Sequence, residues 1–119
     1  MKEFSKSIPG ENDYSIESYS WKDDYLVLIG ANWKFATGSA WRLSKDGEII
    51  ALSQTCDGID QLKCLIQLKI VRIEAQSVTC PVDPCFHLKN GYILEVFSSD
   101  TYEPWEFTAM DGRIFLGMS

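Results

Sequence analysis

The chain has 119 residues, of which 45% are hydrophobic and 13% aromatic, and its formal net charge is −6. This length fits a single domain spanning residues 1–119, and the aromatic content is higher than a disordered chain carries. The acidic balance argues against a nucleic-acid binder, because contacts with phosphates require cations, and it favours a basic partner if the partner is charged.

The sequence predicts no membrane segment and no export signal. Residues 1–13 are polar and lack the apolar region of a signal peptide, and no window approaches the roughly 20 apolar residues of a spanning helix. We therefore expect a cytoplasmic protein whose four cysteines, Cys56, Cys64, Cys80 and Cys85, are reduced. A disulfide between Cys80 and Cys85, which flank a tight polar loop, stays open as an alternative.

The first half of the chain reads as a succession of short strands. Residues 1–13 predict a leader with at most one strand, around Phe4. Alternation and apolar runs then predict strands at 14–21, 25–29, 33–36, 40–43 and 48–52, separated by the charged turn 22–24, by turns at 30–32 and 37–39, and by the Asp46-Gly47 hairpin. This pattern is typical of a meander, in which neighbours in sequence are neighbours in the sheet.

A short helix and a second group of strands follow. Ile59, Leu62, Leu65 and Ile66 fall at helical spacing and predict at most two turns of helix. A long strand is expected at 68–78. Gly91 to Gly112 predicts a β-hairpin, with strands at 92–97 and 105–107, a turn at Ser98–Pro104 and a second turn at Asp111-Gly112.

The two groups of strands are similar enough to predict an internal repeat, with units at 14–52 and 70–116. Trp41 corresponds to Trp105, and Asp46-Gly47 to Asp111-Gly112; chance similarity between two β-rich halves is the alternative. The predicted fold class is mainly β (all-β, or α+β with one short helix). Two similar antiparallel β-meander halves are expected to pack as one sandwich or partly open barrel.

Residues capable of chemistry are few. His87 is the only histidine, and together with Cys80 and Cys85 it offers three zinc ligands that Cys56 or Cys64 would have to complete. The spacing is not a recognised zinc pattern, so we expect neither a metal nor another cofactor. A nucleophilic pair of Cys85 and His87 is conceivable, but no orienting group or oxyanion hole is recognisable, and we expect no catalytic residues.

Acidic turns and aromatic residues are more informative. Trp41 and Trp105 are expected in the core. Tyr102 lies between Asp100 and Glu103 in the turn at Ser98–Pro104, and an exposed tyrosine flanked by carboxylates can anchor an interface with a basic partner. A tyrosine folded back on its own hairpin is the alternative. The candidate partner-binding residues are Asp23, Asp24, Asp100, Tyr102, Glu103 and Glu106.

The order of these features resembles that of small bacterial immunity-protein domains, which accompany polymorphic or contact-dependent toxins. The matching residues are Leu62–Leu65, Ile70–Ile73, Phe86–Leu88, Asn90-Gly91, Leu94–Phe97 and Glu103-Pro104-Trp105. The resemblance implies no catalytic residues and a tight partner, a cognate protein toxin that is often a nuclease with a basic cleft. On this basis we expect a protein that neutralises such a toxin by occluding its active site. The alternatives are a β-barrel that binds a small ligand or is an enzyme, with a pocket around His87, and an oligomeric structural subunit that pairs through a sheet edge.

Overall fold

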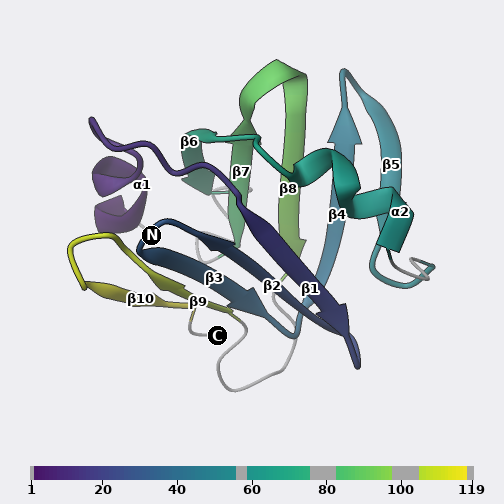
Figure 1. Ribbon diagram of the computed structural model, residues 1–119, viewed down its shortest axis with the longest axis horizontal. Coiled ribbons are helices and arrows are strands. Elements are labelled where there is room, and N and C mark those ends of the chain that lie inside the picture. Colours follow the sequence, from purple (N-terminus) through teal and green to yellow (C-terminus); the bar gives the residue numbers. More distant parts are fainter. Residues whose placement is uncertain (1, 56–58, 76–82, 98–104, 118–119) are drawn as a thin grey trace.

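The computed structural model describes residues 2–55, 59–75, 83–97 and 105–117, and its core is two antiparallel sheets of five strands each. The sheets pack face to face and do not close into a barrel (Figure 1). The first sheet has the order β1 (Ser18–Lys22), β2 (Tyr25–Gly30), β3 (Trp33–Thr37), β9 (Trp105–Thr108) and β10 (Ile114–Leu116). The second has the order β5 (Glu48–Leu52), β4 (Ala40–Lys45), β8 (Tyr92–Phe97), β7 (Pro84–Leu88) and β6 (Ile70–Ala75). The predicted mainly-β class is confirmed.

Short helices complete the described part of the chain. The predicted helix after the first group of strands is present as α2 (Ile59–Leu62), continued by the 3-10 turn η1 (Lys63–Leu65), and a second such turn, η2 (Lys89–Gly91), joins β7 to β8. The expectation of at most a strand around Phe4 is wrong, because Lys2–Ser7 forms the helix α1. Among the described residues, no helix has the length and apolar character needed to cross a bilayer.

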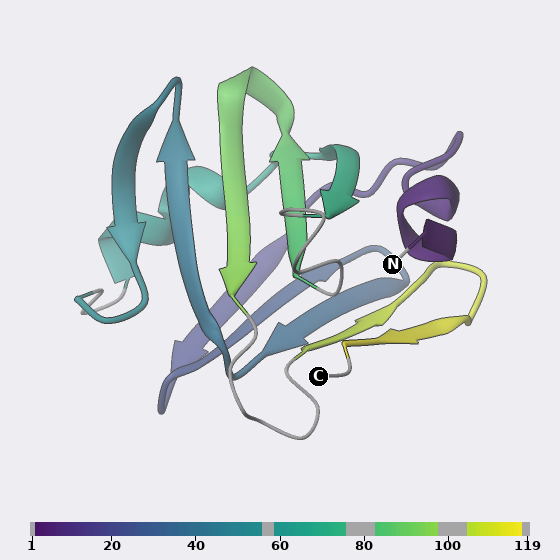
Figure 2. The same ribbon diagram turned by 180° about the vertical axis from the view of Figure 1, so that it is seen from behind.

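The predicted meander is wrong at one point in each half. β3 and β4 lie in different sheets although only Gly38 and Ser39 separate them, and β8 and β9 also lie in different sheets. Residues 91–112 therefore do not form the expected hairpin. Figure 2 shows the strands of one sheet crossing those of the other at a steep angle, so a chain that leaves β3 can enter the other sheet by turning a corner.

This crossing gives both halves of the chain the same topology. The strands β1-β2-β3 form a meander in the first sheet, and β4-β5 form a hairpin at the side of the second. The strands β6-β7-β8 form a meander in the second sheet, and β9-β10 form a hairpin at the side of the first. Each sheet is thus built from three strands of one half and two strands of the other.

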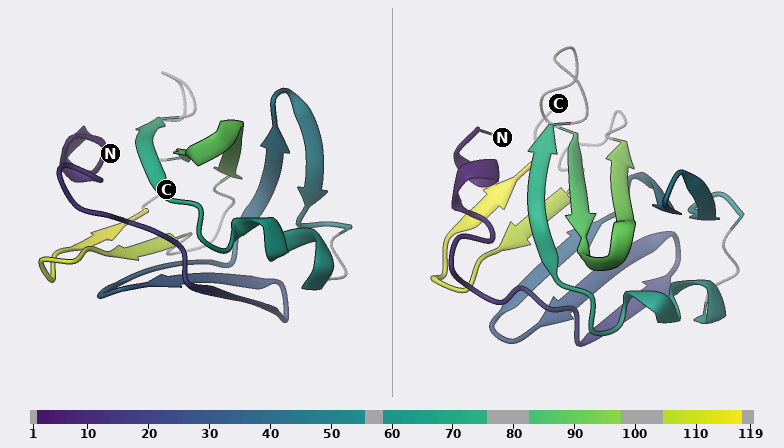
Figure 3. Two further views of the ribbon diagram at one scale, coloured as in Figure 1. Left: turned by 45° about the horizontal axis from the view of Figure 1, so that its top comes forward. Right: turned by 90° about the horizontal axis from the view of Figure 1, so that it is seen from above.

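An aromatic cluster fills the space between the sheets. Phe35, Phe86 and Phe107 are almost fully buried there, and their ring centroids lie 4.7 to 6.3 Å apart. α1 sits beside the end of the β9–β10 hairpin (Figure 3) and inserts Phe4 among the rings of Phe86, Trp105, Phe107 and Phe115. The helix therefore closes an end of the sandwich that the strands leave open.

Candidate functional site

The outer face of the second sheet carries a row of polar side chains that crosses four of its five strands and ends at Leu52 on β5. Register places Glu74 opposite Cys85, Cys85 opposite Glu95, Glu95 opposite Arg42, and Arg42 opposite Leu52. Arg42 donates from Nε and Nη2 to Oε1 of Glu95, at 2.9 and 2.8 Å. The polar groups of this row therefore come from strands far apart in the sequence and meet only through the sheet.

A register shift in β6 brings Glu74 onto this face. Ile70 and Ile73 are both buried although they are three residues apart, and the ladder with β7 shifts between Ile70 and Arg72. Strict alternation would place two residues three apart on opposite faces. The extra residue, Val71, is exposed, so the bulge keeps both isoleucines in the core and turns Glu74 outward, toward Cys85.

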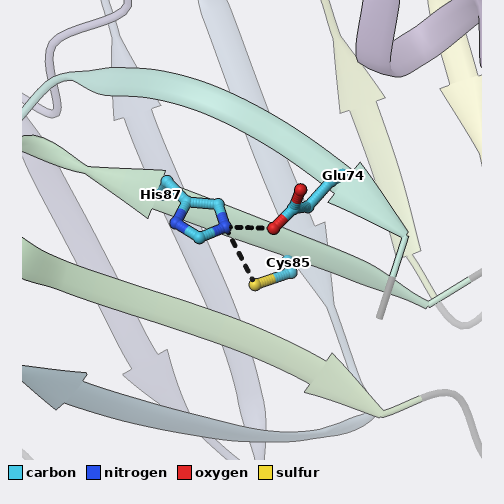
Figure 4. Close-up of side chains that lie close together, drawn as sticks. All are labelled: Glu74, Cys85 and His87. Atoms are coloured by element: carbon cyan, nitrogen blue, oxygen red, sulfur yellow. Dashed lines mark hydrogen bonds and ion pairs between the residues drawn. The ribbon is translucent and has the colours of Figure 1, made fainter. Parts of the chain in front are cut away.

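His87 lies beside this row and faces two of its members (Figure 4). Its Nε2 is 2.5 Å from Oε1 of Glu74 and 3.7 Å from Sγ of Cys85. The guanidinium of Arg72, which is opposite His87 in the register, lies 3.3 Å from Nε2 and 3.4 Å from Nδ1. The lone imidazole is therefore held by a carboxylate, a thiol and a guanidinium from two neighbouring strands.

The thiol of this cluster is protonated at neutral pH. Burial raises the pKa of Cys85 to about 11, and the carboxylates of Glu95 and Glu74 contribute to the rise. An activated cysteine nucleophile requires the opposite shift. The arrangement therefore does not support the Cys85–His87 nucleophile. Cys85 is a free thiol among the described residues, and Cys80, the partner considered for a disulfide, lies outside them.

The predicted partner-binding residues that can be placed belong to the first sheet. Asp23 and Asp24 form the two-residue turn between β1 and β2, and both have positive φ angles, 55° and 60°. Such a turn favours Asp, Asn and Gly, so these aspartates have a conformational role as well as a charge. Glu106 is half-buried on the outer face of β9, between Ala36 and Leu116. Asp100, Tyr102 and Glu103 lie outside the described residues.

The outer face of the first sheet is unusually apolar for a solvent-facing surface. Of the six large hydrophobic side chains that are exposed among the described residues, four lie on this sheet, Tyr25 (49%), Ile29 (40%), Ile114 (60%) and Leu116 (43%), and the other two, Ile49 and Val71, lie on the second sheet. Register places Ile29 and Ile114 in one cross-strand row and Glu106 and Leu116 in the next. We call these four side chains, with Asp23, Asp24 and Glu106, the first-sheet patch. Exposed apolar side chains clustered on one face are typical of an interaction surface.

Comparisons with known proteins add no assignment. No protein family, curated protein or solved structure matches the chain. The cluster around His87 and the first-sheet patch are therefore interpreted from their own geometry.

A surface hollow of about 390 Å³ adjoins the tip of the β1–β2 hairpin. Trp21, Asp24, Ser39, Ser53 and Gln54 are among the residues that line it. Trp21 is held in place by an edge-to-face contact with the buried Trp41, at 5.2 Å between ring centroids. Asp24 forms no hydrogen bond or ion pair within the described residues. An aromatic ring beside an uncommitted carboxylate can receive a cationic side chain.

Sequence reasoning missed Glu74 and the apolar part of the first-sheet patch. Glu74 is separated from Cys85 and His87 by 11 and 13 residues, and only the bulged register reveals that the three side chains meet. For Tyr25 and Ile29 a signal was present. Both alternate with the buried Leu26 and Leu28, so this run is two-faced rather than uniformly buried.

Proposed function

We propose that this chain is a cytoplasmic immunity-type protein that binds and neutralises a basic protein toxin, such as a nuclease, by covering its active-site cleft. The observation that supports the proposal is the first-sheet patch, in which exposed apolar side chains adjoin carboxylates that sequence reasoning had selected. The polar cluster at His87 has no activated nucleophile, so the chain offers binding surfaces more readily than catalysis.

The composition of the patch suits a protein interface. Interfaces bury an apolar centre rich in aromatic residues and place charges at the rim. Here Ile114 and Leu116 supply apolar surface on the edge strand β10, Tyr25 and Ile29 supply it on β2, and the aspartates of the β1–β2 turn supply charge beside Tyr25. Lys22 and Lys34 lie on the same face, and Lys22, which is opposite Tyr25 beside the turn, offsets part of the negative charge of Asp23 and Asp24. A net charge of −6 would also speed the approach of a basic partner.

The hollow adjoins the same hairpin tip from the inner side of the sheet, since Trp21 lies opposite the buried Leu26, and it could receive one cationic side chain of the partner. An arginine or lysine of the partner could place its stem against Trp21 and its charge against Asp24. Bound in this way, the partner would lose a cationic side chain that a nuclease uses to hold phosphate. This is how the surface would inhibit as well as bind.

The test first asks whether a neighbouring gene encodes a toxin, and then measures the affinity of this chain for that toxin and its inhibition of the toxin. Asp23→Asn and Asp24→Asn remove charge but keep a side chain that tolerates a positive φ angle, so the turn is preserved. We expect the double variant to associate at least about tenfold more slowly at low salt. Tyr25→Ala should weaken binding by about 2 kcal/mol if it is an anchor.

The matched control is Glu48→Gln, which removes one exposed carboxylate from β5 in the second sheet. It should leave association almost unchanged. Equal affinity of the wild type, the double asparagine variant and Tyr25→Ala would contradict the placement of the interface. Failure of the wild-type chain to protect cells from the toxin would contradict the proposed function itself.

One observation favours a second candidate function, a subunit that oligomerises through a sheet edge. β10 is a short edge strand, and its outward side chains Ile114 and Leu116 are exposed. Sedimentation across a concentration series separates the two candidates, because only self-association predicts a mass that rises with concentration. The aromatic core that fills the space between the sheets speaks against the third candidate, a β-barrel around a small ligand.

A further inference from the structure

The cluster formed by Glu74, Cys85 and His87 has a property that the proposed interface does not use. One donor atom from each residue, a carboxylate oxygen, Sγ and an imidazole nitrogen, lies within 4.8 Å of the other two. Oxygen, sulfur and nitrogen donors of these residue types form the usual zinc sites of proteins. We propose that Glu74, Cys85 and His87 bind a transition-metal ion, with Zn²⁺ as the expected ion.

The distances can be compared with those of a zinc site. Bonds of about 2.1 Å to nitrogen or oxygen and about 2.3 Å to sulfur, at tetrahedral angles, separate the nitrogen and sulfur by about 3.6 Å and the nitrogen and oxygen by about 3.4 Å. Nε2 of His87 and Sγ of Cys85 are 3.7 Å apart, which already matches. Oε1 of Glu74 is 2.5 Å from Nε2 and would have to withdraw by roughly 0.9 Å for such a bond geometry.

The side chain that has to move is the one free to do so. Glu74 lies on the edge strand β6 and half of its side chain is exposed, whereas the side chain of His87 is mostly covered and Cys85 is buried. The covered side chains of His87 and Cys85 therefore fix the position of the ion, and the carboxylate of Glu74 moves to reach it. Cys85 and His87 are two residues apart on one face of β7, so the strand itself brings the thiol to the nitrogen that Glu74 contacts from β6.

The positive charge of Arg72 would weaken the binding of a metal cation, and this effect can be tested by substitution. Its guanidinium lies 3.3 Å from Nε2 of His87 and 3.6 Å from Oε1 of Glu74, so it stands close to the position of the cation. The side chain is largely exposed and can swing away, at the cost of these contacts. Removing its charge should therefore strengthen metal binding, whereas a purely structural cluster would only lose a partner.

The site would use three protein ligands and leave a fourth position open to water. This is the coordination of reactive rather than purely structural zinc sites. The second-sheet location separates the site from the first-sheet patch, so the inference does not depend on the proposed function.

The test is titration of the chelator-treated full chain with Zn²⁺ against a chromogenic chelator, and with Co²⁺ as a spectroscopic probe. We expect one ion per chain and a thiolate-to-cobalt charge-transfer band in the near ultraviolet. Cys85→Ser should abolish that band, and Cys85→Ser and His87→Gln should each weaken Zn²⁺ binding by more than about 100-fold, because loss of a ligand exceeds loss of a supporting contact. Arg72→Gln should tighten binding, and Cys64→Ala, which removes the other described free thiol, should leave it unchanged.

Circular dichroism of each variant establishes that the sheets are intact. A wild-type chain that binds no Zn²⁺, or that binds it equally well after Cys85→Ser and after His87→Gln, would overturn the proposal. A cobalt complex without the charge-transfer band would overturn it as well, because it would show that Cys85 is not a ligand.

Discussion

Trp41 and Trp105 occupy the same register position in two different sheets. Trp41 of β4 lies opposite Val96 of β8, and Trp105 of β9 lies opposite Thr37 of β3. Both indoles are buried. The next inward pairs along these ladders, Leu43 with Leu94 and Phe107 with Phe35, correspond in the same way. Each tryptophan is therefore the first inward side chain of the strand that enters the opposite sheet.

We predict that Trp41→Ala and Trp105→Ala each lower the free energy of unfolding by about 3–5 kcal/mol, because each leaves a large cavity between the sheets. Urea denaturation followed by circular dichroism measures this. Trp21→Ala is the control, since Trp21 is only half-buried and packs on Trp41 from outside; its loss should cost less than half as much. Equal losses for all three variants would contradict the assignment of the two core positions.

Trp41→Phe should cost less than its lost volume suggests. Nε1 of Trp41 is buried and has no hydrogen-bond partner among the described residues. A buried N–H without a partner costs about 1–3 kcal/mol, and phenylalanine removes that N–H. We expect Trp41→Phe to be nearer to the wild type than to Trp41→Ala in urea denaturation. A loss as large as that of Trp41→Ala would indicate that the indole N–H is satisfied.

Phe4 should contribute as much to the free energy of unfolding as a core residue of the sheets does, although it lies on a helix of only six residues. Its ring lies 4.9 to 6.2 Å from the ring centroids of Phe86, Trp105, Phe107 and Phe115. We predict that Phe4→Ala destabilises the chain by about 3–5 kcal/mol. Lys6→Ala, on the exposed side of the same helix, controls for helix propensity and should change stability by less than about 0.5 kcal/mol.

Individual strands could be predicted from the sequence because their boundaries are marked by turn residues. Asp46-Gly47 and the aspartates at 23 and 24 all have positive φ angles, and each pair joins the two adjacent strands expected of it. The partition into two sheets could not be predicted. Gly38 and Ser39 at the crossing look like any tight turn, and only packing of the apolar faces decides which sheet the next strand joins.

The cross-strand neighbours were also out of reach of sequence reasoning. The ladders make Leu28 of the first half correspond to Phe86 of the second, since Leu28 lies opposite Phe35 and Phe86 lies opposite Leu94, whereas the sequence allows Leu88 as the counterpart of Leu28 equally well. A shift of two residues leaves the inward face unchanged and is invisible in a hydrophobic pattern. The bulge at Val71 has no sequence signature either, so Glu74 could not be placed beside His87.

The raised pKa of Cys85 predicts slow alkylation. At pH 8 a thiol with the ordinary pKa of 9.0 is about one-tenth thiolate, and a shift to about 11 reduces this fraction roughly a hundredfold. Because the folded state favours the neutral thiol, the stability linked to Cys85 is present below pH 9 and is lost as the pH rises toward 11. Iodoacetamide labelling of the chelator-treated protein, with mass spectrometry of the Cys85 peptide, should show a rate that climbs steeply above pH 9.

The same labelling measures the contribution of the neighbouring carboxylate. Glu95→Gln removes a negative charge that raises the pKa of Cys85, so alkylation at pH 8 should become faster, although burial, the larger cause, remains. The chain unfolded in urea supplies the reference rate of an unperturbed thiol. An unchanged rate in Glu95→Gln would mean that burial alone controls the thiol.

Gly30 should be intolerant of a side chain for a steric reason. A methyl group there would collide with Nε1 of Trp33 and the carbonyl oxygen of Ser15, which are joined by a 3.2 Å hydrogen bond. We predict that Gly30→Ala costs about 1–3 kcal/mol, as overpacking of a filled core does. Gly47→Ala is the comparison, because open space surrounds Gly47 and the cost there comes only from its φ angle of 87°, about 1–2 kcal/mol.

A second substitution distinguishes the steric cause of the loss at Gly30 from the conformational cause of the loss at Gly47. Trp33→Phe removes the nitrogen that a methyl group at Gly30 would meet, so Gly30→Ala should cost less in the Trp33→Phe background than in the wild type. Gly47→Ala should cost the same in both backgrounds, because Gly47 does not contact the indole. Additive losses at Gly30 and Trp33 would show that the carbonyl oxygen of Ser15, rather than the indole, excludes the methyl group.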